Sequence, residues 1–95
     1  MSKKRDELIA STKQQLDDLN KKMDELEAKA NEAKQDARDA YKAQMVKLRS
    51  QSKLAMDRFE EFKEAGDDAW DNAVAEMEKV RDAFAHSVNY FKSQI

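Results

Sequence analysis

Apolar residues in the first two thirds of the chain recur at alternating steps of three and four positions. This heptad spacing is typical of a helix that buries one narrow apolar seam against other helices. It predicts one long helix over about residues 3–65. The seam residues expected to mediate self-association are Ile9, Leu16, Leu19, Met23, Leu26, Ala30, Ala33, Ala37, Phe59 and Phe62.

The middle of this predicted helix is rich in alanine, with six alanines between positions 28 and 43. Alanine has the highest helix propensity, so we expect the helix to continue through this stretch. Alanine side chains bury little area, so the stretch should form a narrow waist between larger apolar anchors at the two ends. Two successive steps of four, from Ala37 to Tyr41 to Met45, form a stutter that locally unwinds a coiled coil.

A break in the helix is predicted at residues 66–68. Gly66 is the one glycine of the chain and suits the left-handed position that ends many helices, while Asp67 or Asp68 could cap a following helix. A lone glycine weakens a helix by only about 1 kcal/mol, so an uninterrupted rod stays open as the alternative.

A second, shorter helix is predicted over about residues 69–94. Its apolar face is formed by Trp70, Val74, Met77, Phe84, Val88 and Phe91. This face is broader than a two-stranded seam, which indicates a helix that contacts two neighbours.

Together these elements predict an all-α helical hairpin, a single coiled-coil domain over residues 1–95. The return helix is too short to cover the seam from Ile9 to Leu26, and an exposed apolar stripe is an association site. We therefore expect a dimer, antiparallel and centred near Ala33 to Ala37, in which each end is a three-helix bundle. The basic residues 3–5 of one chain would then approach the acidic stretch near the partner's break. A parallel dimer is the other arrangement.

Composition narrows the function classes. The chain has 18 basic and 20 acidic residues, one histidine and no cysteine, so disulfide frameworks and thiol-based zinc sites are excluded. No nucleophile–base set and no glycine-rich phosphate loop can be assembled, so we expect no enzyme and no cofactor. No signal peptide is visible and no apolar run exceeds three residues. We therefore expect a cytoplasmic protein without a membrane span.

Two short clusters of charged residues are candidate binding sites. Glu78, Asp82 and His86 are spaced by four, so they line one helix face, but a zinc site normally has more histidine or cysteine ligands. Lys3, Lys4 and Arg5 are basic, but nucleic-acid binders carry larger basic patches and a net positive charge. We expect neither a metal site nor nucleic-acid binding.

Several segments resemble a known family. They are residues 4–9 (KRDELI), 15–20 (QLDDLN), 23–30 (MDELEAKA) and 66–70 (GDDAW). They are similar to a family of small bacterial coiled-coil proteins linked to stress responses. The resemblance implies a helical, non-enzymatic, stress-linked protein and implies no ligand residues.

Three functional interpretations follow. The first is a non-enzymatic structural or interaction protein that self-associates. The second is an amphipathic coat protein that binds lipid or polymer granule surfaces, in the manner of phasins. The third is a regulatory coiled coil whose main partner is another protein.

Overall fold

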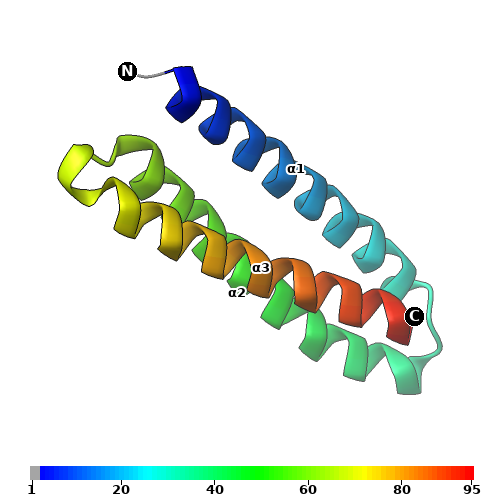
Figure 1. Cartoon of the computed structure of the whole chain (residues 1–95). Coiled ribbons are helices and arrows are strands. Elements are labelled where there is room, and N and C mark those ends of the chain that lie inside the picture. Colours follow the sequence, from blue (N-terminus) through cyan, green and yellow to red (C-terminus); the bar gives the residue numbers. More distant parts are fainter. Residues whose placement is uncertain (1–2) are drawn as a thin grey trace.

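The structure is a computed structural model that describes residues 3–95, and it confirms the all-α prediction. Its helices are α1 (Lys3–Asn31), α2 (Gln35–Glu64) and α3 (Trp70–Gln94), with a short 3-10 turn, η1 (Asp67–Ala69), before α3. They run up, down and up in an elongated bundle of 51 × 18 × 17 Å, and the C-terminus lies beside the connection from α1 to α2 (Figure 1).

The single helix expected over residues 3–65 is wrong, because the chain turns back at residues 32–34. Folding back lets the apolar face of α1 pack on α2 and α3 of the same chain. The hydrophobic gain from this long-range packing outweighs the few helical hydrogen bonds lost at the turn.

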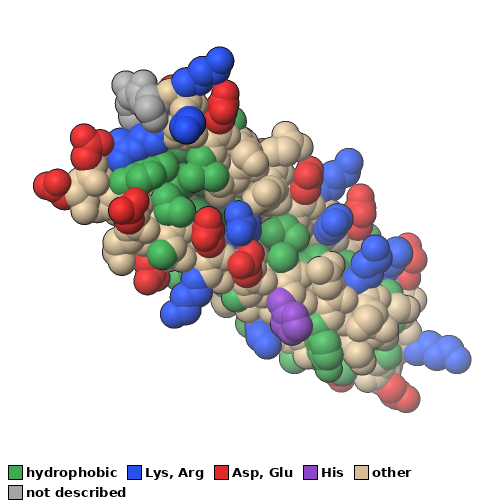
Figure 2. All heavy atoms as spheres, viewed as in Figure 1, with side chains coloured by type: hydrophobic (Ala, Val, Ile, Leu, Met, Phe, Trp, Pro, Cys, Tyr) green, Lys and Arg blue, Asp and Glu red, His purple; other side chains and the backbone are tan. Residues whose placement is uncertain are grey.

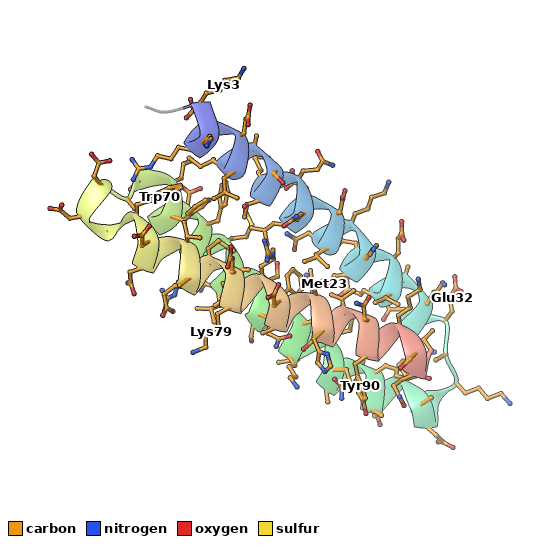
Figure 3. The ribbon with its side chains drawn as sticks, viewed as in Figure 1. Lys3, Met23, Glu32, Trp70, Lys79 and Tyr90 are labelled. Carbon is orange, nitrogen blue, oxygen red and sulfur yellow. The ribbon has the colours of Figure 1, made fainter. Side chains whose placement is uncertain are left out.

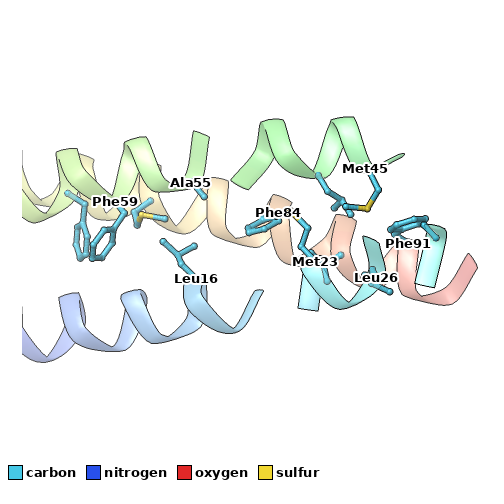
Figure 4. Close-up of a cluster of buried hydrophobic side chains, with 13 residues drawn as sticks. Leu16, Met23, Leu26, Met45, Ala55, Phe59, Phe84 and Phe91 are labelled. Carbon is cyan, nitrogen blue, oxygen red and sulfur yellow. The ribbon is translucent and has the colours of Figure 1, made fainter. Parts of the chain in front are cut away.

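The core runs along the bundle axis and receives side chains from all three helices (Figure 4). Its apolar members are Leu16, Met23, Leu26 and Ala30 from α1, Met45, Leu48, Ala55, Phe59 and Phe62 from α2, and Met77, Phe84, Val88 and Phe91 from α3. Most of them sit at the three- and four-residue spacings read from the sequence.

The second reversal falls at the predicted position but has a different geometry. Gly66 is extended, with φ −77° and ψ 176°, so the expected left-handed glycine is wrong. The expected caps are also wrong, since neither Asp67 nor Asp68 makes a side-chain hydrogen bond that caps η1 or α3. Backbone bonds close the turn instead, from Ala65 N–H to the carbonyl of Phe62 at 3.3 Å and from Ala69 N–H to that of Gly66 at 3.1 Å.

The length and apolar character of a helix decide whether it can span a membrane. Within residues 3–95, no helix combines the length and the apolar character needed to cross a bilayer.

Candidate interaction surface

The core-facing sides of α2 and α3 together form an apolar groove that α1 occupies. The largest side chains that line it are aromatic: Phe59 and Phe62 on α2, and Phe84 and Phe91 on α3. All four are at most 3% exposed. We call this surface the α1 groove.

The α1 side of the contact is a regular row of anchors. Leu16, Met23 and Leu26 are at most 5% exposed, and Figure 3 shows Met23 directed from α1 toward the other two helices. Ile9 and Leu19 are only half-buried at the margins of the contact. The buried row spans about two heptads, which is the anchor pattern of an amphipathic helix in a groove.

Trp70 lies at the end of the bundle where α1 begins (Figure 3), between an arginine and a second aromatic ring. The guanidinium carbon of Arg5 lies 4.0 Å from the centre of the Trp70 ring, which stacks on Phe62 at 4.9 Å. Arg5 also pairs with Asp67 at 3.2 Å. Charge attraction between the basic N-terminus and the acidic break, expected between chains, therefore occurs within one chain.

A polar pair sits in the middle of the α1–α2 contact. The side-chain amide of Asn20 donates to the Leu16 carbonyl at 3.0 Å, and its oxygen accepts a hydrogen bond from the Ser52 hydroxyl. Both residues are half-buried. A partly buried polar pair of this kind favours one register, because a shifted α1 would separate the Asn20 side-chain oxygen from the Ser52 hydroxyl.

Charged contacts hold α1 to each of its neighbours. Arg49 of α2 donates from Nε to Glu27 at 3.0 Å, and Arg81 of α3 donates to Gln15 at 3.0 Å. The hydrogen bond to Glu27 and the charge of its carboxylate raise the pKa of Arg49 above its ordinary value. These exposed contacts orient α1 and add little to stability.

Open surface hollows flank α1 on both sides. A hollow of about 260 Å³ lies between α1 and α2, lined by Glu27, Ala30 and Met45 among others. A second hollow, of about 380 Å³, lies between α1 and α3 next to Leu19 and Arg81. Hollows of about 210 and 340 Å³ also lie between α2 and α3, so such hollows do not set α1 apart. The helix contacts do, because α3 packs against α2 more closely than α1 packs against either helix.

Each residue of the predicted seam and return-helix face is buried or half-buried within the single chain. The fully buried ones are Leu16, Met23, Leu26, Ala30, Phe59, Phe62, Met77, Phe84, Val88 and Phe91, and the half-buried ones are Ile9, Leu19, Ala33, Ala37, Trp70 and Val74. The chain thus covers its own seam, which removes the exposed stripe from which a dimer was inferred. Dimerisation itself stays a prediction.

Sequence reasoning missed the polar contacts between helices. The Asn20–Ser52 and Glu27–Arg49 pairs join residues far apart in the sequence. Nothing local distinguishes them from the many other polar residues on helix faces. Their only signal is position: Ser52 lies in the heptad row itself, and Asn20 directly follows Leu19.

The candidate metal cluster of the sequence lies on the outer side of α3. Glu78, Asp82 and His86 are all exposed, and Asp82 accepts hydrogen bonds from Arg81. Among residues 3–95 no three histidine or acidic side chains gather closely enough to hold a metal ion.

Comparisons with protein-family models, with curated proteins and with solved structures find no match to this chain.

Proposed function

We propose that this chain is a non-enzymatic interaction protein that works by binding an amphipathic helix in the α1 groove. The observation that carries the proposal is the seating of α1, whose anchors Leu16, Met23 and Leu26 fill the groove at heptad spacing. The looser packing of α1 on its two neighbours, compared with that of α3 on α2, supports exchange of this helix for another.

The charged exterior is a weaker candidate for recognition. On the face seen in Figure 2, acidic and basic side chains alternate over the surface. The chain as a whole carries a formal net charge of −2. Interleaved charges of both signs favour solubility over capture of one charged partner.

The test separates the chain's own α1 from its groove. Leu16→Asp buries a carboxylate at a site that is 1% exposed, which should undock α1 while leaving the residues of α2 and α3 unchanged. A fluorescently labelled peptide of residues 3–31 is then titrated into this full-length variant. We expect one peptide to bind per chain, with a gain in helical circular dichroism.

The matched control is the same peptide carrying Leu16→Asp, which should bind at least about tenfold more weakly. Equal binding of the two peptides, or none by the unmodified peptide, would contradict the proposal. The wild-type chain should bind the peptide weakly, because its tethered α1 competes at high effective concentration.

The granule-coat and protein-partner interpretations give different outcomes. Coating a lipid or polymer surface requires the bundle to open, because Phe59, Phe84 and Phe91 are buried. Opening would separate Trp70 from Arg5 and Phe62 and shift its fluorescence when neutral lipid vesicles are added. We expect no shift. A foreign protein that co-purifies at fixed stoichiometry would identify the occupant of the groove as another chain.

The resemblance to stress-linked coiled-coil proteins adds a physiological setting to the proposal. The protein should then become more abundant in its host after heat or osmotic shock. Unchanged abundance would remove this part of the proposal and leave the helix-binding activity untouched.

A further inference from the structure

The connection between α1 and α2 has the composition of a helix. Glu32, Ala33, Lys34 and Gln35 all favour helix, and the segment contains neither glycine nor proline. Lys34 has a helical φ of −62° but an extended ψ of 152°, and no side chain caps the start of α2. At Lys34, therefore, only ψ departs from its helical value.

We propose that α1 exchanges between two copies of this chain. The turn at residues 32–34 straightens, α1 and α2 join into one long helix, and each α1 fills the α1 groove of the other copy. This inference rests on the proposed function and names a second copy as the partner. Swapping keeps every contact of α1 and adds helical hydrogen bonds at the turn.

The polar contacts that α1 makes within one chain can also form when α1 binds to a second chain. Its Gln15, Asn20 and Glu27 pair with residues of α2 and α3, all of which lie beyond the turn. The same pairs can therefore form between chains in the same register. Arg5 likewise would find the Trp70 ring of the partner at the far end of each half.

The remaining helix does not obstruct the opened form. The Gln94 carbonyl at the end of α3 accepts a hydrogen bond from the Tyr41 hydroxyl at 3.1 Å, so the end of α3 is attached to α2 and not to α1. The two straightened segments would cross near Ala33 and Ala37, whose small side chains permit close approach of two helices.

The closed form has its own advantages at low concentration. Arg38 donates from Nη2 to the Ala33 carbonyl at 3.1 Å, which satisfies a backbone acceptor of the turn. Its α1 is also tethered beside the groove, whereas a second copy must be recruited from solution. We therefore expect monomer at low concentration and swapped dimer after refolding at high concentration.

The first experiment measures molar mass by light scattering after refolding from micromolar to millimolar concentrations. The wild-type chain should pass from its 11.0 kDa mass to twice that value. Gln35→Pro tests the turn. Position 35 opens α2 and follows the extended Lys34, so proline suits the closed form, yet it would interrupt a continuous helix.

Gln35→Pro should lower the dimer association constant at least about a hundredfold. Gln35→Ala, which suits both forms, should leave the constant near that of the wild type. A wild-type chain that stays monomeric at millimolar concentration, or a Gln35→Pro chain that dimerises equally, would overturn the swap.

The second experiment shows which chain supplies α1. Chains carrying Asn20→Cys are mixed with chains carrying Ser52→Cys, unfolded, refolded together at high concentration and oxidised. A mixed disulfide dimer is expected, because these two short side chains meet across the α1–α2 contact. Asn20→Cys mixed with Asp68→Cys, which lies at the far reversal, is the control and should give little product.

A dimer in which the first mixture gives no more disulfide than the control would mean that the copies meet face to face, and the swap would be wrong. Failure here is distinct from failure of the proposed function. A chain that binds the peptide of residues 3–31 yet never forms a swapped dimer rejects only the swap.

Discussion

The two reversals of this chain are built in opposite ways. The connection at residues 65–69 contains the one glycine and two aspartates, and it is fastened by the stack of Phe62 on Trp70. The connection at residues 32–34 has helix-favouring residues and no side-chain cap on the helix that follows. The residues at 65–69 mark a reversal in the sequence. Those at 32–34 do not, and the turn there permits α1 to pack on the other two helices.

This difference extends to the helices that the two turns join. α2 and α3 pack against each other more closely than α1 packs against either of them. Parts of a protein with fewer buried contacts open at lower free energy than the rest. We therefore expect α1 to undock before α2 and α3 separate.

The largest effect on stability should come from a substitution that disrupts the reversal at residues 65–69. Phe62→Ala removes a ring that is 1% exposed and stacks on Trp70 at 4.9 Å. It should lower the free energy of unfolding by about 3–5 kcal/mol. Urea denaturation followed by circular dichroism measures the loss. Leu54→Ala, at a side chain that is 42% exposed, is the control, and a similar loss there would contradict the core assignment.

Undocking α1 should cost less and act locally. Leu16→Ala should lower the free energy of unfolding by about 2–4 kcal/mol, because it leaves a cavity where a buried side chain stood. Amide hydrogen exchange should then accelerate chiefly in α1, with smaller changes in α2 and α3. Uniform acceleration in all three helices would show that the bundle opens only as one unit.

The contacts of Arg5 with Trp70 and Asp67, which we call the arginine clamp, should contribute about 1 kcal/mol to the free energy of unfolding. Arg5→Ala removes the contact with the Trp70 ring and the ion pair with Asp67, and its side chain is only 13% exposed. Thermal unfolding at low and high salt separates the two parts, since salt weakens the ion pair more. Lys4→Ala, at an exposed neighbour, should change stability little; an equal effect would reject the clamp.

The smallest effect concerns the glycine itself. Gly66→Ala should stabilise the chain by about 0.5 kcal/mol, because φ is −77° and a Cβ there meets no atom within 4 Å. The gain arises from reduced freedom of the unfolded chain. A loss of about 1 kcal/mol, measured by thermal unfolding, would instead indicate the left-handed conformation that glycine alone adopts easily.

Heptad spacing identified most of the residues that point inward. Leu16, Met23 and Leu26 repeat on one face of a helix, and so do Phe84, Val88 and Phe91, because helical period alone decides which side chains share a face. Burial of these residues and the reversal near Gly66 could therefore be predicted. The extended geometry of Gly66 could not, since the flanking backbone bonds also satisfy a turn without a left-handed residue.

Helix content, the inward faces and one of two turns were thus determined by the sequence alone, through local propensity and period. Which helix covers each apolar face was decided only by tertiary structure. An apolar stripe is stabilised equally by a helix of its own chain or of another, because the hydrophobic effect depends on area and not on connectivity. The turn at residues 32–34 carries no signal in local propensity, and it is the turn that lets Leu16, Met23 and Leu26 be buried against helices of the same chain.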